Sequence, residues 1–374
     1  MIYLDNAATT RPCAEACEAV SYAMRERFGN ASSLHKMGIL SGQILSSAKR
    51  TLLTALASSP KSSGRRPLDG DIYFTSGATE SNNTALLGAC AAYRRLGNKI
   101  VSTAIEHPSV ARVLDKLESE GYEVVRLAPK DHPDFEQALA DCVDDRTVLV
   151  SCMAVNNETG FTVDVNRLYK LVKRKNDKTI VHIDAVQGFL KVPLNGDLIS
   201  VSGHKIHACK GIGALYVKKG VRFAPLLLGG GQQKNLRSGT EPVELIAGLE
   251  AAVKAYHGDH ERFAALKAHL LERLSAMENI GINSDEKCVP NIINFSVRGV
   301  RSEIMLHSLE ENEIYVSSGS ACSKGKTSSV PAALGVADKD ADCAVRVSLC
   351  ADTTEQEIDA LCDKIEKTIE RVRR

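Results

Sequence analysis

The chain has 374 residues, of which 44% are hydrophobic and 25% charged, and it carries a formal net charge of +1 at pH 7. Such a composition is ordinary for a globular protein, and the length predicts two or three domains. The small net charge argues against recruitment of nucleic acid or an anionic membrane by the overall field, and no apolar run approaches the roughly 20 residues that cross a bilayer.

From residue 71 to about residue 220, short β-rich runs alternate with helical stretches. The seven runs that we interpret as strands are DIYFT, KIVST, EVVRLA, TVLVSCMA, TIVHIDA, LISVSG and GALYVKK. Near-continuous apolar strands separated by helices are typical of a mainly parallel sheet covered on both faces. We therefore predict an α/β protein whose large domain, residues 13–257, contains a mainly parallel seven-stranded sheet. A polar, turn-rich segment at 58–70 is expected to be a surface loop.

The pattern changes after about residue 241. The elements expected there are two long helices at 242–257 and 261–279, the strand NIINFSV, a helix at 301–312, the strands EIYVSS and AVRVSL, and an amphipathic helix at 354–371. This mixture predicts a smaller α+β domain, residues 258–374, and residues 1–12 are expected to pack with it.

The cysteines indicate a reducing compartment. Eleven of them are scattered without a C-x-x-C pair, so we expect neither a zinc ribbon nor another metal site. The first residues, MIYLDNAATT, lack the pattern of a signal peptide, and a cytoplasmic location is expected. Cysteines within apolar patterns, such as Cys90 and Cys152, are expected to be small buried hydrophobes.

Polar residues follow several of the predicted strands, at the sheet edge where ligands bind in such folds. Asp184 ends one strand, and Lys205 follows the next strand 21 residues later. The turn SGATES leads from another strand into a helix, whose N-terminus is suited to an anion. These are the parts of a pyridoxal phosphate (PLP) site. The lysine forms a Schiff base with the aldehyde of the cofactor, the acid pairs with its pyridine nitrogen, and the turn binds its phosphate. The nucleotide motifs G-x-G-x-x-G and G-x-x-x-x-G-K-[ST] are absent.

A set of motifs extends this interpretation over nearly the whole chain. In order they are YLDNAATT, TSGATES, EH-P, VNNETG, HIDAVQ, SGHK-I, KGIGALYV, GGGQQ-LRSGT, SSGSAC and VRVSL. They closely resemble cysteine desulfurases of the NifS/IscS type, in the class V branch of fold-type I PLP enzymes. The resemblance implies the fold-type I architecture, a PLP cofactor and removal of sulfur from L-cysteine to give L-alanine and an enzyme-bound persulfide.

The resemblance also assigns roles to individual residues. Lys205 is implied as the lysine that binds PLP, and His107 as the residue that stacks over the cofactor ring and moves protons. Further cofactor-binding positions are implied for the phosphate (Ala78, Thr79, Ser202 and His204), the pyridine nitrogen (Asp184) and the phenolic oxygen (Gln187 and Asn157). Arg346 resembles the arginine that holds the substrate carboxylate, with Asn157 beside it. Thr240 resembles a residue that reaches the partner's phosphate, which implies a homodimer.

Cys322 matches the persulfide cysteine of the family. Its surroundings agree with that role, because Lys324 and Lys326 follow closely and nearby cations favour the nucleophilic thiolate. Cys209 and Cys350 depart from the family pattern, and we favour inert thiols at both positions. The implied partner is a sulfur-acceptor protein, of iron–sulfur cluster assembly or of tRNA thiolation.

Other functions remain open from the sequence. The same cofactor would serve a selenocysteine lyase, a cysteine sulfinate desulfinase or an aminotransferase, although an aminotransferase needs no thiol in SSGSAC. A non-catalytic sulfur-relay scaffold that keeps the fold is the alternative from another class. The presence of Lys205, Asp184, His107 and Cys322 counts against it.

Overall fold

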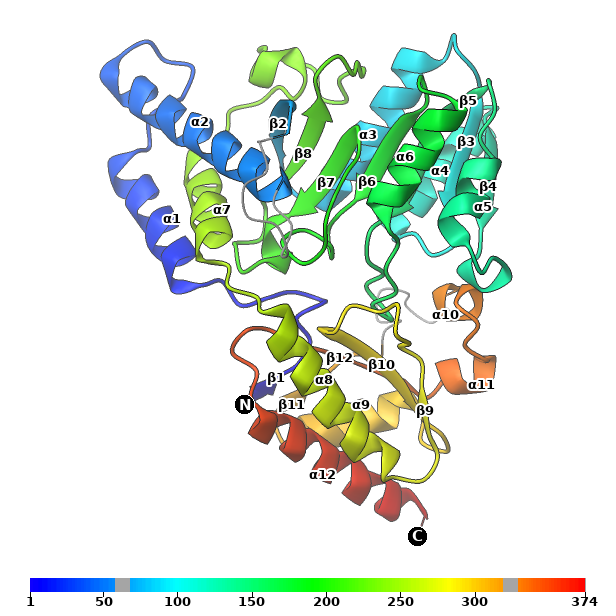
Figure 1. Cartoon of the computed structure of the whole chain (residues 1–374). Coiled ribbons are helices and arrows are strands. Elements are labelled where there is room, and N and C mark those ends of the chain that lie inside the picture. The colour runs from blue at the N-terminus through cyan, green and yellow to red at the C-terminus, as the bar shows by residue number, and fades with distance from the viewer. Residues whose placement is uncertain (58–67, 319–328, 374) are drawn as a thin grey trace.

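The computed structural model describes residues 1–57, 68–318 and 329–373 (Figure 1). Most of the expected surface loop lies outside these ranges, and so does the segment 319–328 that contains Cys322, called the Cys322 segment below. The ribbon forms an upper body that holds the large sheet and a lower body that carries both ends of the described chain (Figure 1).

The large sheet has seven strands in the order β2-β8-β7-β6-β5-β3-β4. They are β2 (Gly70–Thr75), β3 (Lys99–Thr103), β4 (Glu123–Leu127), β5 (Thr147–Met153), β6 (Ile180–Asp184), β7 (Leu198–Ser202) and β8 (Gly213–Lys218). Strand β8 runs antiparallel to both of its neighbours, and the remaining pairs are parallel. Every residue of β5, β6 and β7 is buried, as expected for a sheet covered on both faces. The predicted α/β class and the mainly parallel sheet are confirmed.

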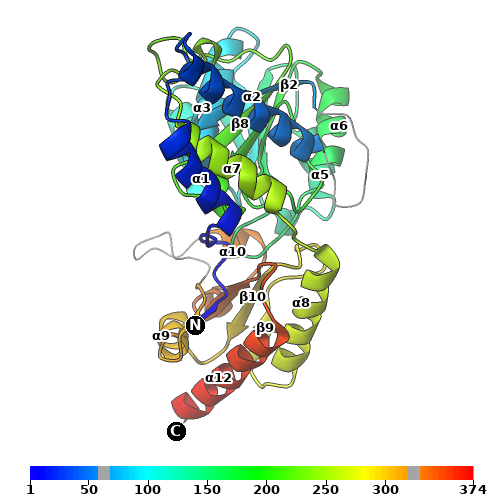
Figure 2. The same ribbon diagram turned by 90° about the vertical axis from the view of Figure 1, so that its left-hand side faces the viewer.

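Helices cover both faces of this sheet. On one face lie α3 (Ala78–Tyr93) and α4 (Pro108–Ser119), and their apolar residues share a core cluster. A second core cluster includes the apolar faces of α2 (Lys36–Ala57), α5 (Phe135–Asp141), α6 (Val165–Lys175) and α7 (Val243–Ala255). Figure 2 shows α1 (Ala14–Glu26) beside α7, with which it makes extensive contacts.

The lower body is built on an antiparallel sheet in the order β12-β10-β9. Its strands are β9 (Ile280–Ile282), β10 (Ile292–Val297) and β12 (Ala344–Ser348), and its main helices are α8 (His260–Ser275), α9 (Ser302–Glu310) and α12 (Glu355–Arg373). Two short helices, α10 (Val330–Ala333) and α11 (Asp338–Ala341), lie before β12. Leu4 belongs to the core cluster of this body. The predicted domain boundaries remain a prediction.

Two elements differ from the expectation. The run EIYVSS forms only a two-residue strand, β11 (Ile314–Tyr315), which pairs with β1 (Ile2–Tyr3), and its Ser317 forms an isolated antiparallel bridge with Arg346 of β12. Strand β9 was not expected, because its three residues are too few to show a pattern. The first difference arises from pairing between segments that are distant in the sequence.

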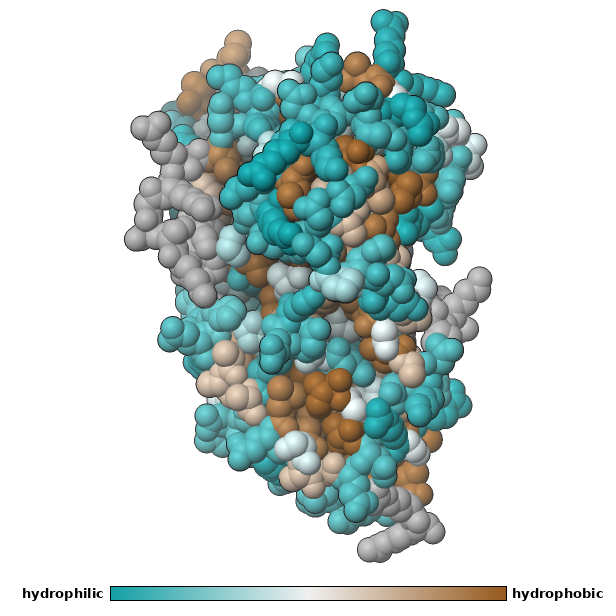
Figure 3. Space-filling view, turned by 45° about the vertical axis from the view of Figure 1, so that its right-hand side comes forward, coloured by the Kyte–Doolittle hydropathy of each residue, from teal (hydrophilic) through white to brown (hydrophobic). Residues whose placement is uncertain are grey.

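The surface in Figure 3 is largely hydrophilic over the upper body, with a gathering of hydrophobic residues lower in the view. Within the described ranges, no helix has the length and apolar character that a membrane crossing requires.

Candidate active site

The predicted site residues gather at one edge of the large sheet, around a cavity of about 480 Å³. Strand β2 is antiparallel to β8, which is antiparallel to β7, so β2 and β7 end at the same edge. Gly213, the first residue of β8, pairs with both Thr75 and Ser202. The cavity is lined by ten of the predicted residues, namely Ala78, Thr79, His107, Asn157, Asp184, Gln187, Ser202, His204, Lys205 and Arg346.

Glycines bring the turn after β2 close to β8. A Cβ atom at Gly213 would lie 2.7 Å from the Cα of Gly77, so a side chain at that position would push the turn away. Gly77 itself has φ +154° and ψ −179°, a conformation that L side chains rarely adopt. Two glycines in contact therefore set the place where α3 begins.

Helix α3 presents its N-terminus to the cavity without a side-chain cap. Ala78 and Thr79 are its first residues, and their N–H groups belong to the helical turn that has no intrahelical partners. The next residue, Glu80, accepts from the Ser76 N–H at 2.7 Å and pairs with Arg237 at 2.7 Å. Burial would raise the pKa of Glu80, but these contacts lower it below its ordinary value. The arrangement is one that favours an anion at the helix start.

The predicted PLP lysine lies in a short turn after β7, against the N-terminal segment. Lys205 Nζ donates to the main-chain oxygens of Ala7 at 2.6 Å and Ala8 at 2.7 Å. Gln187 Nε2 donates to the same Ala7 oxygen at 2.8 Å. His204 Nδ1 lies 3.1 Å from the Thr9 hydroxyl, and burial, with a smaller effect of Lys205, lowers the pKa of His204 to about 4.

Asp184 is buried at the end of β6 with two hydrogen-bond donors. Its Oδ2 accepts from Asn82 Nδ2 at 2.8 Å and its Oδ1 from the Val186 N–H at 3.0 Å. Asn82 Nδ2 also donates to Ser109 Oγ at 2.9 Å. A carboxylate held in this way has a fixed direction at the floor of the cavity.

His107 is connected to the same network through Ser109. The Ser109 N–H donates to His107 Nδ1 at 3.1 Å, and Ser109 Oγ lies 2.8 Å from that nitrogen. Because Nδ1 accepts a hydrogen bond, the neutral ring carries its proton on Nε2. Burial and the charge of Lys205 lower the pKa of His107, against the opposing effect of Asp184.

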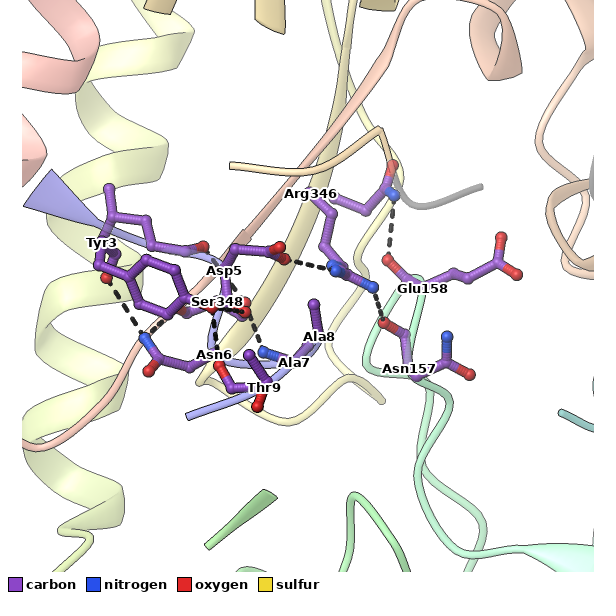
Figure 4. A network of polar contacts seen from close by, with 12 residues as sticks. Tyr3, Asp5, Asn6, Ala7, Ala8, Thr9, Asn157, Glu158, Arg346 and Ser348 are labelled. Carbon is purple, nitrogen blue, oxygen red and sulfur yellow. Dashed lines mark hydrogen bonds and ion pairs between the residues drawn. The ribbon is translucent and has the colours of Figure 1, made fainter. Parts of the chain in front are cut away.

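Arg346, on β12, reaches the cavity from the lower body (Figure 4). One terminal nitrogen donates to Asp5 Oδ1 at 2.6 Å and the other to the Asn157 main-chain oxygen at 2.9 Å. Arg346 is only 4% exposed. Its main chain exchanges two hydrogen bonds with Ser317, two residues before the stretch that contains Cys322.

One predicted residue lies away from the cavity lining, and another falls outside the part of the chain that the structure describes. Thr240 is exposed and does not line this cavity, and Cys322 lies outside the described residues. Sequence reasoning missed Asp5, Asn82 and Ser109, which contact predicted residues directly. The only signal for them was their position inside or just after the motifs YLDNAATT, TSGATES and EH-P.

Comparisons with known proteins agree with this geometry. The family model described as "Aminotransferase class-V" matches residues 2–361. A cysteine desulfurase of Trichormus azollae is 36% identical over 387 residues, covering 100% of this chain and 94% of the relative. A solved NifS-like protein has a TM-score of 0.86 at 32% identity, with 99% of each chain covered. A structure of SspA in complex with cysteine has a TM-score of 0.79 at 28% identity, covering 95% of this chain and 100% of SspA. The chain belongs to the class V aminotransferase family, within its cysteine desulfurases of the NifS/IscS type.

Proposed function

We propose that this chain is a PLP-dependent cysteine desulfurase that takes the sulfur of L-cysteine onto Cys322 and releases L-alanine. The observation that carries the proposal is that Lys205, Asp184, His107 and Arg346 together line the cavity at the sheet edge. A lysine, a buried acid, an imidazole and a guanidinium on one cavity match an amino-acid substrate bound beside PLP.

The residues present fit PLP in three respects. The uncapped N-terminus of α3 offers N–H groups to a phosphate, with Ser202 and His204 also on the cavity wall. Asp184 is a buried acid with two donors, suited to a pyridinium nitrogen. Gln187 would donate from its amide nitrogen to the phenolic oxygen. Bound there, PLP supplies an electron sink for the α-carbon of the substrate.

The protein's own residues perform the remaining tasks in this proposal. Arg346 and Asn157 hold the substrate carboxylate, and Lys205 removes the α-proton. His107, neutral near pH 7, moves a proton close to the substrate sulfur. The Cys322 thiolate attacks that sulfur. A sulfur–sulfur bond forms as the carbon–sulfur bond breaks, and the carbon fragment takes up protons to leave as alanine.

The described ends of the Cys322 segment support this role. Ser317, five residues before Cys322 in the chain, lines the cavity. After the segment, Val330 packs in a cluster with Ile105 and Met153, beside the cavity.

Partner proposals follow from the same site. Thr240 is exposed and does not line the cavity of its own chain. This position fits the proposed contact with a second copy in a homodimer. The persulfide would then pass to an acceptor protein of iron–sulfur cluster assembly or of tRNA thiolation. A selenocysteine lyase or cysteine sulfinate desulfinase is the alternative activity of the same residues.

The test is incubation of the PLP-loaded protein with L-cysteine and a mild reductant, measuring alanine and sulfide together. Equal yields of both are expected, and Cys322→Ser should abolish sulfide release while the visible spectrum of the bound cofactor persists. Cys350→Ser is the matched control and should remain active. Sulfide release by Cys322→Ser would remove the nucleophile assignment. Higher rates on selenocysteine or cysteine sulfinate would favour the alternative activity.

A further inference from the structure

Asp5 belongs to a segment whose main chain is fixed beside β12. Its backbone forms an isolated bridge with Ser348, and the Ser348 N–H donates to the Leu4 oxygen at 2.7 Å. The Tyr3 hydroxyl donates to the Asp5 main-chain oxygen at 3.2 Å. Residues two apart on a strand share one face, so Arg346 lies on the same face of β12 as Ser348. The carboxylate of Asp5 therefore reaches the guanidinium without a rearrangement of the main chain (Figure 4).

Protein acceptors already occupy both terminal nitrogens of Arg346. Asp5 takes one and the Asn157 main-chain oxygen takes the other, at 2.6 and 2.9 Å. The third nitrogen, Nε, is buried from solvent and has no hydrogen-bond partner among the described residues. A carboxylate binds a guanidinium best through two parallel hydrogen bonds. Each terminal nitrogen has a second N–H group, so a substrate carboxylate that binds both of them would lie beside the contacts that Asp5 and Asn157 now make.

Asp5 is the more consequential of these two acceptors because it carries a charge. In the described part of the chain, it is the one carboxylate paired with Arg346. The pair is neutral, and a substrate carboxylate would add a negative charge to a site where Arg346 is 4% exposed. With a neutral residue at position 5, the same substrate would instead neutralise a buried guanidinium. Electrostatic interactions are strong in such poorly solvated places.

We propose that Asp5 is an internal competitor of the substrate carboxylate for Arg346. This rests on the proposed role of Arg346 in holding that carboxylate. Asp5 keeps the guanidinium paired and oriented between turnovers and lowers the affinity of the site for amino acids. Its consequence for the reaction is that the carboxylate of the alanine product is released easily, because Asp5 already neutralises the guanidinium.

The test is the substitution Asp5→Asn, which keeps a hydrogen-bond acceptor but removes the charge. We expect the PLP-loaded variant to bind L-alanine about three- to tenfold more tightly by isothermal titration calorimetry. The KM for L-cysteine should fall by a similar factor, without a rise in kcat. Unchanged or weaker alanine binding would overturn the proposal.

Two further variants separate this proposal from the role of Arg346. Arg346→Gln should weaken alanine binding, and adding Asp5→Asn to it should then have little further effect. If Arg346→Gln leaves alanine binding unchanged, the proposal that Arg346 holds the substrate carboxylate is wrong. If Arg346→Gln weakens alanine binding while Asp5→Asn alone does not change it, Arg346 holds the substrate carboxylate but Asp5 does not compete with it.

The matched control is Asp340→Asn, which removes a similar carboxylate from Arg298 at 2.7 Å, outside the cavity. It should leave alanine binding unchanged. If Asp5→Asn does not fold, as judged by its thermal transition, Asp5→Ser is the second variant, because it removes the charge with a smaller side chain. It must also bind alanine more tightly, or the proposal is wrong.

Discussion

The side-chain amide of Asn82 donates to the carboxylate of Asp184 at 2.8 Å, although 102 residues separate them in the chain. The same nitrogen donates to Ser109 Oγ, which lies 2.8 Å from His107 Nδ1. The acid proposed for the pyridine nitrogen and the imidazole proposed for the sulfur chemistry are thus held by one hydrogen-bond network. Its hub comes from α3, one turn after the residues proposed for the phosphate.

Asn82→Ala should weaken the binding of PLP. The substitution removes a donor from a buried carboxylate, and hydrogen bonds to charged groups contribute about 1.5–3 kcal/mol, which corresponds to a loss of roughly ten- to 150-fold in affinity. Titration of the apoprotein with PLP, followed by absorbance, measures the change. Asn83→Ala is the matched control, because Asn83 donates to the Thr79 main-chain oxygen and not to the acid. Equal affinities for the two variants would contradict the role of Asn82.

The desulfurase rate should decline on the acidic side only below the pH at which an ordinary histidine titrates. Burial lowers the pKa of His107, so the ring stays neutral at pH values where a solvent-exposed imidazole is already protonated. The measurement is kcat/KM for L-cysteine between pH 5 and pH 8. A His107→Asn variant should lose most of the activity, and its remaining activity should no longer decline over the acidic part of this pH range. If kcat/KM of the variant declines at acidic pH as it does in the parent, a group other than His107 causes that decline.

Glu106→Gln should stabilise the protein at alkaline pH. Burial raises the pKa of Glu106 to about 8, and its Oε2 is buried without a hydrogen-bond partner among the described residues. In the unfolded chain the carboxyl ionises near its ordinary pKa of 4.5. Between these two values the unfolded state binds fewer protons, so the free energy of unfolding falls by about 1.4 kcal/mol per pH unit. Replacement by glutamine removes this loss.

Urea unfolding at pH 5 and pH 8 measures the effect of Glu106→Gln. The gain of the variant over the parent should be larger at pH 8, because only there does the parent chain bear the full cost of its buried acid. The control is Glu118→Gln, on the exposed side of α4. An advantage of Glu106→Gln that is the same at both pH values would show that the carboxyl is not protonated in the folded protein.

Gly213→Ala should displace the turn that begins α3. The added Cβ would lie 2.7 Å from the Gly77 Cα, a contact with main chain that a flexible side chain cannot relieve. We expect a lower thermal midpoint and at least a tenfold loss of PLP affinity, since a shifted helix start no longer aims its N–H groups at the phosphate. Gly42→Ala is the control, because its Cβ would meet only the Ala31 oxygen at 3.8 Å. Wild-type PLP affinity in Gly213→Ala would disprove the importance of this contact.

Much of the site was predictable because strand ends of a parallel sheet meet at one edge. Asp184 and Lys205 follow neighbouring strands, and their apolar runs in the sequence were long enough to identify. Asn82 and Ser109 could not be found in this way. Each lies in a helix whose rotation relative to the sheet depends on how α3 and α4 pack against one another.

By itself, the sequence determined the α/β class, the order of the strands along the chain and the family. These follow from local apolar patterns and from motifs of a few residues. Only the tertiary structure decided that β11 pairs with β1, that β8 is antiparallel to its neighbours, and that Asp5 forms an ion pair with Arg346. The last of these contacts joins residues 341 positions apart. Their pairing depends on the packing of the first residues against β12, and no local pattern encodes a contact made by burying two distant segments together.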